Sequence, residues 1–403
     1  MQAPTLISLF AGAGGLDIGL ERAGFHTIAA NDFDRHCIAT LLQNQALEHA
    51  VSEGSGRTHL EGAKILSESI VELSAKDLRP DGAGRTWRPD LLAGGPPCQP
   101  FSSAGSQRSL TDTRGRLFEE FVRIAAEMRP RAILFENVRG LVTARGSSGV
   151  PGEAVNEVRA AFEGIGYATA FRVLNAADYG APQRRVRLFM VGAASDTALP
   201  ALPLPTHARR PSDDATLKPW ISLGEFLAGR PDPAADDIVR PSALLASLLA
   251  GLPDGTGLKS PGRAEPTRPG GHWGYKQGTF IANQELPART VTGASTQDWI
   301  RSRDGELRRL TLREVASLQG FPETWEFAGP KARRFLQVGN AVPATFGEVL
   351  GLSIREALKR KPGEASRSLP FPQEMAAAIK YATRDDLRNG LVRPRSPRYA
   401  IEL

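Results

Sequence analysis

Short apolar runs alternate with helical patterns over residues 1–197, and this alternation constrains the fold more than any other feature of the chain. Runs of strand length lie at 5–9, 26–30, 90–93, 132–135 and 186–191. Helical patterns occupy 15–23, 34–45 and 117–128. Because strands that are joined through helices run parallel, we expect an α/β fold with a mainly parallel sheet.

The pattern changes after residue 197. Residues 198–270 are rich in proline, glycine and aspartate, and helical patterns return at 311–319 and 344–358. We therefore divide the chain into a large α/β domain, a smaller irregular domain, a return to the first domain and a peripheral extension, at 1–197, 198–305, 306–360 and 361–403. The polar, glycine-containing residues 52–63 predict a surface insertion.

The glycine-rich segment FAGAGG directly follows the first expected strand and opens a helix. Gly12, Gly14 and Gly15 would let the backbone turn sharply and approach a ligand closely. Asp32, at the end of the second strand, suits the hydroxyls of a ribose, and Phe33 suits stacking on an adenine. The pattern fits a dinucleotide, S-adenosylmethionine or a plain structural turn, and Asp32 also fits a helix cap.

Cys98 lies in a stiff loop of glycines and prolines after the run at 90–93. A lone cysteine is more often a small buried hydrophobe, and that description suits Cys37, which lies within a helical pattern. Glu136 directly follows the run at 132–135. Since these two runs belong to one strand–helix–strand unit, their carboxyl ends should share one edge of the sheet. The sequence therefore predicts that a thiol, an acid and a glycine-rich loop converge.

The order of motifs along the chain resembles that of the cytosine carbon-5 DNA methyltransferase family, of the bacterial restriction–modification type. The segments that carry the resemblance are LFAGAGGLDIGL, GGPPCQPFSSAG, DTRGRLF, FENVRGL, YGAPQRRVRLFMVG, RRLTLREVASLQGFPETW and QVGNAVPA. The resemblance implies a Rossmann-like S-adenosylmethionine-dependent catalytic and cofactor-binding domain at 1–197 and a target-recognition domain at 198–305. It implies methyl transfer from S-adenosylmethionine to carbon 5 of a flipped cytosine in a specific site of double-stranded DNA.

The chemistry of that reaction fits the residues that the sequence brings together. Carbon 5 of cytosine is a poor nucleophile, and addition of the Cys98 thiolate to carbon 6 would push electron density onto it. Glu136 would steady N3 of the ring if burial raises its pKa. By resemblance, Cys98 is the nucleophile, Glu136 contacts the ring, and Arg185 and Arg187 position the base and the nucleophile.

The resemblance also assigns residues to the cofactor and to DNA. The cofactor residues are Phe10, Gly12, Gly14, Gly15, Asp32, Phe33, Ser69, Ile70, Pro97, Leu117 and Asn340. The DNA-contacting residues are Gln99, Ser102, Gln183, Arg289, Thr290 and Thr292. Residues 99–113 would close over DNA as a lid. Ser8 and Ser69 replace acids that family members carry at the matching positions, and the sequence indicates no metal site.

Residues 259–303 combine lysines and arginines with Trp273, Tyr275, Phe280 and Trp299. Basic side chains suit phosphates, and aromatic rings can fill the space left by an extruded base. A small domain with its own core and a solvated basic face would show the same composition. Both interpretations stay open at the level of the sequence.

The formal charge of +6 is compatible with a polyanionic partner. Two cysteines indicate a reducing compartment, and no apolar run approaches the ~20 residues of a membrane span. We expect a cytoplasmic, nucleoid-associated monomer in a bacterium. The family setting adds a cognate restriction endonuclease, acting on the same site, as a candidate partner.

Three other functions compete with this hypothesis. A transfer-RNA cytosine methyltransferase of the same family usually carries a Cys-Phe-Thr segment, whereas this chain has no cysteine after Cys98. A DNA-binding relative without turnover would not need Glu136, Arg185 and Arg187 together. A nicotinamide-dependent dehydrogenase would explain the glycine-rich loop and leave the Pro-Pro-Cys and Glu-Asn-Val segments unexplained.

Overall fold

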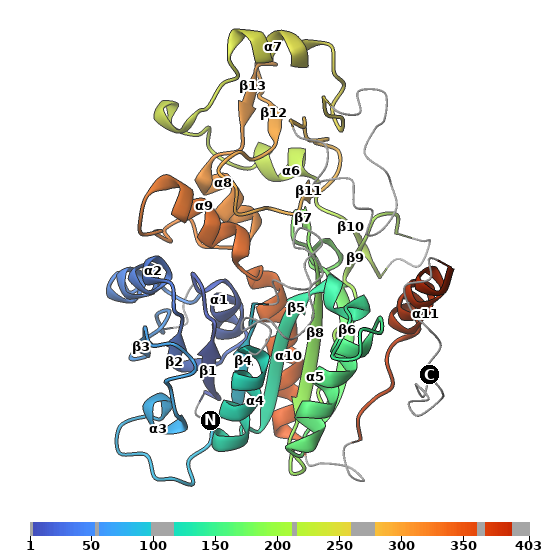
Figure 1. Ribbon diagram of the computed structural model, residues 1–403. Helices are drawn as coiled ribbons and strands as arrows, with labels where there is room; N and C mark the ends of the chain where they lie inside the picture. Colours follow the sequence, from blue (N-terminus) through green and yellow to red (C-terminus); the bar gives the residue numbers. More distant parts are fainter. Residues whose placement is uncertain are drawn as a thin grey trace.

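The computed structural model describes residues 3–52, 56–97, 117–211, 216–258, 279–360 and 367–388. A seven-stranded sheet forms its centre, in the order β3-β2-β1-β4-β5-β8-β6 (Figure 1). Its strands are β1 (Thr5–Leu9), β2 (His26–Asn31), β3 (Lys64–Leu66), β4 (Leu91–Gly94), β5 (Ala132–Val138), β6 (Ala168–Asn175) and β8 (Val186–Ala193). β8 is antiparallel to both of its neighbours, and the other pairs are parallel. The expected mainly parallel α/β fold is confirmed.

The central strands are apolar on both faces because helices cover both sides of the sheet. In β1, Leu6, Ile7 and Leu9 have no exposed surface, and Ser8 is almost fully buried between them. Continuous burial of this kind is typical of parallel strands, which read as unbroken apolar runs.

One face of the sheet is covered by α4 (Leu117–Met128) and α5 (Glu153–Gly164), which lie in front of it in Figure 1. The rings of Phe121, Phe135 and Phe162 meet edge to face there, with centroids 5.8 to 5.9 Å apart. Edge-to-face packing is a favourable arrangement for buried aromatic rings. This cluster joins both helices to β5, the strand that carries the proposed acid.

The other face is covered by α1 (Gly15–Arg22) and α10 (Ala344–Lys359), the latter behind the sheet in Figure 1. The two helices approach so closely that a Cβ on Gly19 would lie 2.8 Å from the Cα of Gly347. Only glycine permits this contact. It fastens the C-terminal part of the chain to the helix that follows the first strand.

Further elements complete the two helical layers and the edges of the sheet. They are α2 (Arg35–Ala46), α3 (Ala75–Leu78), η2 (Arg139–Thr143), η3 (Ala176–Tyr179), α8 (Leu312–Leu318), α9 (Lys331–Asn340) and α11 (Gln373–Arg388). The Asp34 side chain caps α2 by accepting from the backbone N–H of His36 at 2.7 Å. Thr311 and Glu314 form a reciprocal capping box at the start of α8. These caps explain why the helices begin where they do.

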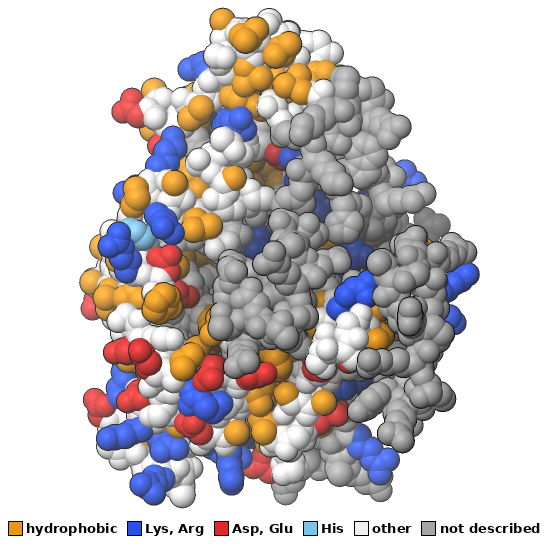
Figure 2. All heavy atoms as spheres, in the orientation of Figure 1, with side chains coloured by type: hydrophobic (Ala, Val, Ile, Leu, Met, Phe, Trp, Pro, Cys, Tyr) orange, Lys and Arg blue, Asp and Glu red, His pale blue; other side chains and the backbone are white. Residues whose placement is uncertain are grey.

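A smaller region lies above the edge of the sheet at which β1, β4 and β5 end (Figure 1). Its elements are α6 (Leu223–Ala228), η4 (Ala235–Asp237), α7 (Ala243–Ala250) and the strand pairs β7 (Gln183–Arg184) with β11 (Ala288–Arg289), β9 (His207–Ala208) with β10 (Lys218–Pro219) and β12 (Trp299–Arg301) with β13 (Leu307–Arg309). Trp299 and Ile281 are buried in its own small core. In Figure 2 hydrophobic side chains gather at the top over α7, where Leu244 is 73% exposed.

The aromatic residues of this region therefore serve its packing where the structure describes them. Phe280 and Trp299 are both buried, which favours the small-core interpretation for these two. Trp273 and Tyr275 lie outside the described residues.

Three local expectations differ from the structure. Glu136 does not follow its strand but lies within β5, opposite Phe189 of β8. The segment 52–63 is not a plain surface insertion, because His59 and Leu60 are buried. The tail was expected to be peripheral, and although α11 lies at the side of the molecule, its Met375 and Ile379 join the main core.

Candidate active site

Glu136 and Arg187 form an ion pair at the edge of the sheet where β5 and β8 meet. Arg187 Nε lies 3.1 Å from Glu136 Oε1, and Glu136 is 8% exposed. Burial raises the pKa of the Glu136 carboxyl, and the positive charges of Arg187 and Arg185 pull that pKa back down. The site can therefore hold a carboxylic acid that keeps its proton at a higher pH than an exposed glutamate does.

The chain that leads to Cys98 begins directly against this pair. A Cβ on Gly95 would lie 2.5 Å from Glu136 Oε2, so the loop backbone touches the carboxyl group. The Asn137 side chain donates a hydrogen bond to the carbonyl of Pro96 at 3.1 Å and fixes the next residue of the loop. Sequence reasoning missed Asn137, although its place beside Glu136 in one motif was a usable signal.

Cys98 itself lies outside the described residues, as do Gln99 and Ser102. Its convergence with Glu136 therefore stays a prediction, although the described foot of the loop, Gly95 and Pro96, lies where that prediction needs it. The other cysteine, Cys37, is buried in α2, and burial raises the pKa of its thiol. Cys37 thus has the structural character that the sequence indicated.

Arg185 is placed differently from Arg187. It is 1% exposed and donates to the carbonyls of Val291 and Gly339, each at 2.9 Å. These carbonyls belong to the end of the smaller region and to α9. Arg185 therefore links those two segments beside the active site. Its positive charge lowers the pKa of Glu136, but less than the charge of Arg187 does.

Gln183 supports the same junction and is fully buried. Its amide donates to the side-chain oxygen of Gln319 at 2.6 Å and to the carbonyl of Leu318 at 2.7 Å. Gln319 in turn donates to the carbonyl of Val338 at 2.7 Å. The structure thus places Gln183, predicted to touch DNA, in an internal amide relay, and Gln319 is a member of it that the sequence did not single out.

The remaining predicted DNA contacts are half-buried. Arg289 pairs with Asp298 and lies over the Phe280 ring at 3.7 Å, and the Thr290 hydroxyl donates to the carbonyl of Arg184 at 2.7 Å. Thr292 accepts a hydrogen bond at its carbonyl from Gln297. Their contact with bases stays a prediction.

The glycine-rich loop has one open and one packed side. Gly12 has φ +58°, and a Cβ there would meet no described atom within 4 Å, whereas Gly14, with φ +86°, and Gly15 pack against other segments. Phe10 also adopts a left-handed conformation, with φ 55°. A non-glycine residue in this region is uncommon, and such strain clusters at functional sites.

Asp32 connects the loop to the end of β2. Its carboxylate accepts from the backbone N–H of Gly12 at 2.8 Å and from that of Asp34 at 2.8 Å. Burial raises the pKa of Asp32, and these hydrogen bonds oppose the rise. Since Asp34 is the residue that caps α2, Asp32 is left to shape the loop. Beside it, the Phe33 ring is 79% exposed and is available for stacking.

Three of the other predicted cofactor residues follow strand ends, and two lie at helix ends. Ile70 is buried and Ser69 half-buried beyond β3, Pro97 is exposed beyond β4, Leu117 begins α4 and Asn340 ends α9. The segment after β3 is held by a residue that the sequence analysis missed. The Asn31 side chain donates to the carbonyls of Leu66 and Glu68, at 3.0 and 2.9 Å.

A buried acid behind the loop was also missed. Asp17 is 1% exposed, and neither of its carboxylate oxygens has a hydrogen-bond partner among the described residues. Burial raises its pKa to about 7, and the nearby Ser8 hydroxyl acts in the opposite direction. The sequence resemblance puts Ser8 where some family members have an acid, and in this structure the acid Asp17 of α1 lies close to Ser8.

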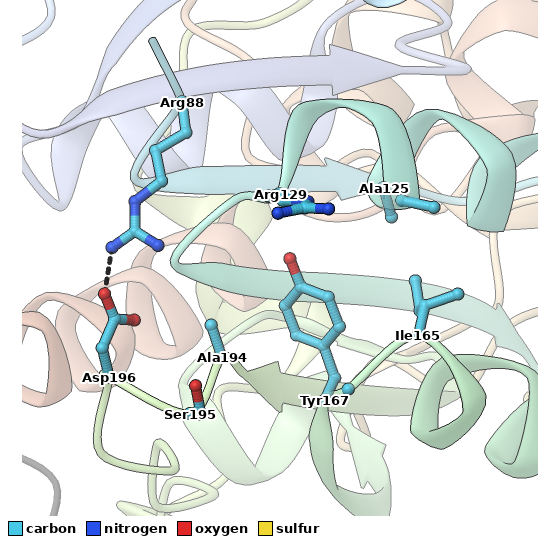
Figure 3. A pocket seen from close by; sticks show the side chains of 10 residues that line it. Arg88, Ala125, Arg129, Ile165, Tyr167, Ala194, Ser195 and Asp196 are labelled. Atoms are coloured by element: carbon cyan, nitrogen blue, oxygen red, sulfur yellow. Dashed lines mark hydrogen bonds and ion pairs between the residues drawn. The ribbon is translucent and has the colours of Figure 1, made fainter. Parts of the chain in front are cut away.

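A cavity of about 520 Å³ lies at the opposite edge of the sheet, away from these residues (Figure 3). Arg88 and Asp196 form an ion pair beside it, and the Tyr167 hydroxyl donates to the carbonyl of Pro130. None of the predicted site residues lines this cavity. Within the described part of the chain, no cluster of three or more histidine, cysteine or acidic side chains could hold a metal ion.

No helix among the described residues combines the length and apolar character needed to cross a membrane.

Comparison with known proteins gives consistent matches. The family model for C-5 cytosine-specific DNA methylase matches residues 5–222 and 263–356. The chain is 31% identical over 371 residues to the type II methyltransferase M.FnuDI of Fusobacterium nucleatum, covering 88% of this chain and 95% of that protein. It is 32% identical over 416 residues to M.XorII of Xanthomonas oryzae pv. oryzae, covering 94% and 91%.

Solved structures agree with the fold. The S. pombe Dnmt2 methyltransferase has a TM-score of 0.58 at 18% identity, and covers 89% of this chain and 100% of its own. The Entamoeba histolytica methyltransferase EhMeth has a TM-score of 0.61 at 14% identity, with the same coverage. These likenesses establish a methyltransferase-type α/β fold.

Proposed function

The chain belongs to the C-5 cytosine-specific DNA methylase family, and we propose on this basis that it methylates carbon 5 of cytosine in duplex DNA with S-adenosylmethionine as donor and Cys98 as nucleophile. The observation that carries the residue assignment is the buried Glu136–Arg187 pair in contact with Gly95, at the foot of the Cys98 loop.

Cys98 and Glu136 act on opposite parts of the cytosine ring. The Cys98 thiolate adds to carbon 6, which places negative charge on the ring. A hydrogen bond from the protonated Glu136 carboxyl to N3 stabilises that charge. The raised pKa of Glu136 supports the protonated form, and Arg187 holds the carboxyl in place. Once carbon 5 carries the methyl group, loss of its proton and of the thiolate restores the aromatic ring.

The residues at the ends of β1 and β2 fit S-adenosylmethionine, which supplies an electrophilic methyl group on a positively charged sulfur. Asp32 would bind the ribose hydroxyls, and the exposed Phe33 ring would stack on the adenine. The open side of the loop at Gly12 lets a ligand approach the backbone.

Access to carbon 5 requires the cytosine to leave the base stack, because the duplex shields it. The region above the sheet edge, residues 198–305, would read the site, with Arg289, Thr290 and Thr292 as base-reading candidates. Gln99 and Ser102 would contact DNA from the lid at 99–113. Because the relatives are type II methyltransferases, this chain fits the modification enzyme of a restriction–modification system. We further propose that it acts as a monomer in the bacterial cytoplasm, beside a cognate endonuclease.

Transfer of label separates this proposal from its rivals. The protein is incubated with methyl-tritiated S-adenosylmethionine and a long mixed-sequence duplex, with matched RNA in parallel, and the labelled nucleoside is identified by chromatography. We expect 5-methylcytosine in DNA with wild type and with Cys37→Ser, whose residue is buried in α2 and has no proposed role in the reaction, and none with Cys98→Ser. Label in RNA alone, or undiminished label with Cys98→Ser, would overturn the proposal.

A further inference from the structure

Trp325 lies between α8 and α9 and has no exposed surface. Its ring belongs to a core cluster that includes Leu41 of α2 and Phe335 of α9. The indole Nε1 is buried without a hydrogen-bond partner among the described residues. The ring therefore contributes contact surface at this position.

The Trp325 ring packs against the glycine-rich loop. A Cβ on Gly14 would lie 3.2 Å from Cζ2 of Trp325 and 3.1 Å from Cδ2 of Leu41. At Gly15 the same construction meets the carbonyl oxygen of Val342 at 2.5 Å, with Phe321 Cζ third nearest at 3.4 Å. The C-terminal part of the chain thus forms a floor under Gly14 and Gly15, at the start of α1, and Trp325 is its part under Gly14.

Gly12 shows that this floor supports only one side of the loop. A Cβ there would meet no described atom within 4 Å, although its φ is left-handed like that of Gly14. Among the described residues Gly12 has no neighbour on its Cβ side, where the proposed function has the ligand approach, whereas Gly14 faces the indole. Trp325 is therefore placed to act on a ligand through the loop and not by touching the ligand.

The indole is itself fixed from several sides. His59 meets it edge-on, with ring centroids 5.7 Å apart, and Phe321 lies 6.1 Å away. Nδ1 of His59 lies 2.5 Å from the carboxylate of Glu21, which belongs to α1. The ring is thus packed, through His59, against the helix that follows the loop.

We propose that Trp325 is a positioning residue for the cofactor, which holds Gly14 in its left-handed conformation so that the loop keeps the shape that receives S-adenosylmethionine. This inference rests on the proposed function, because it takes residues 10–15 to be the cofactor loop. Trp325→Phe keeps a ring in the cluster and loses no hydrogen bond, but leaves space under Gly14. We expect it to weaken cofactor binding about tenfold, since a loop that loses its support must be ordered by the ligand.

A double-mutant cycle tests the contact directly. The dissociation constant of S-adenosylhomocysteine, the demethylated product, is measured by calorimetry for wild type, Gly14→Ala, Trp325→Phe and the double variant. The methyl group that Gly14→Ala adds would meet both Trp325 and Leu41, and Trp325→Phe removes the first contact but neither the second nor the backbone strain at φ +86°. The double variant should therefore still bind less tightly than wild type, but a few-fold more tightly than the product of the two single effects predicts. Gly12→Ala is the matched control and should weaken binding equally in both backgrounds.

Loss of stability is separated from loss of positioning by Phe171→Leu. Phe171 is buried on β6 and packs on Phe371, with ring centroids 5.3 Å apart, and β4, β5 and β8 separate β6 from β1 in the sheet. It should lower the thermal midpoint without changing cofactor affinity. If Trp325→Phe does not fold at the assay temperature, Trp325→Tyr takes its place in the cycle.

Two results would overturn the inference. One is additivity of the Gly14 and Trp325 effects. The other is wild-type affinity in the Trp325 variant. Failure of the wild-type protein to bind either S-adenosylmethionine or S-adenosylhomocysteine would instead overturn the proposed function, and the inference with it.

Discussion

A single methyl group added at Gly95 should disable the proposed acid while leaving the fold intact. The Cβ of Gly95→Ala would lie 2.5 Å from Glu136 Oε2, and non-bonded carbon and oxygen atoms in proteins essentially never approach within 3.0 Å. The carboxyl group must therefore move by at least about 0.5 Å, away from a position that Arg187 holds at 3.1 Å. Gly95 does not have a positive φ, so alanine adds no backbone strain.

The magnitude follows from how steeply catalysis depends on position. A displacement of about 1 Å can cost about 10²-fold in rate, so we expect methylation to fall by about tenfold to a hundredfold, or about 1.4 to 2.7 kcal/mol in activation free energy. Overpacking should also lower the free energy of unfolding by about 1 to 3 kcal/mol. The rate loss should appear in single-turnover methylation with saturating DNA and cofactor.

A second glycine provides the control. Gly164→Ala, at the end of α5, places its Cβ within 4 Å of no described atom, so the rate should stay at the wild-type value and the thermal midpoint should not fall. If Gly95→Ala methylates DNA within twofold of wild type while folded, Glu136 does not act from the position described.

Three further predictions concern carboxyl groups. Burial raises the pKa of Asp17 from 3.8 to about 7, so the stability that its proton provides is present below pH ~4 and lost as the pH rises through 7. Asp17→Asn should remove that decline and raise the free energy of unfolding at pH 8 by up to about 4 kcal/mol. Equal pH dependence of the thermal midpoints of wild type and variant would contradict this. Because burial also raises the pKa of Glu136, single-turnover rates should fall as the pH rises through that pKa, and Glu136→Gln should be about 10²-fold slower and lack the fall. Asp32→Asn should lose one of two hydrogen bonds to backbone N–H groups and weaken cofactor binding about tenfold or more in calorimetry, with DNA affinity in a filter-binding assay unchanged.

The order of strands and helices around the site was predictable because the spacing of apolar residues along the sequence indicates each element locally. The runs that became β1, β4 and β5 are apolar at nearly every position, and the loops after them carry glycine, proline or an acid. Parallel pairing then brings the ends of these strands to one edge without further information. The sequence predicts that this strand ends at Phe135, before Glu136, because a polar residue inside a buried strand looks like the end of the strand.

Contacts between distant segments were not predictable, since no local pattern records them. Arg185 is predicted to position the base and the nucleophile, but nothing near it in the sequence shows that it also donates to the carbonyls of Val291 and Gly339. His59 lies in a polar stretch that reads as surface, and only its pairing with Glu21 of α1 explains its burial. The same holds for Met375, which reaches the core from a tail that is rich in proline.

Formation of a covalent bond between Cys98 and a cytosine tests the central claim most directly. A duplex in which 5-fluorocytosine replaces cytosine is incubated with the protein and S-adenosylmethionine, and the denatured mixture is examined by mass spectrometry after proteolysis. Fluorine at carbon 5 blocks the proton loss that releases the enzyme, so the account predicts a stable adduct on the peptide that contains Cys98. An adduct on Cys37, or full methylation of ordinary cytosine with no adduct on the fluorinated duplex, would contradict it.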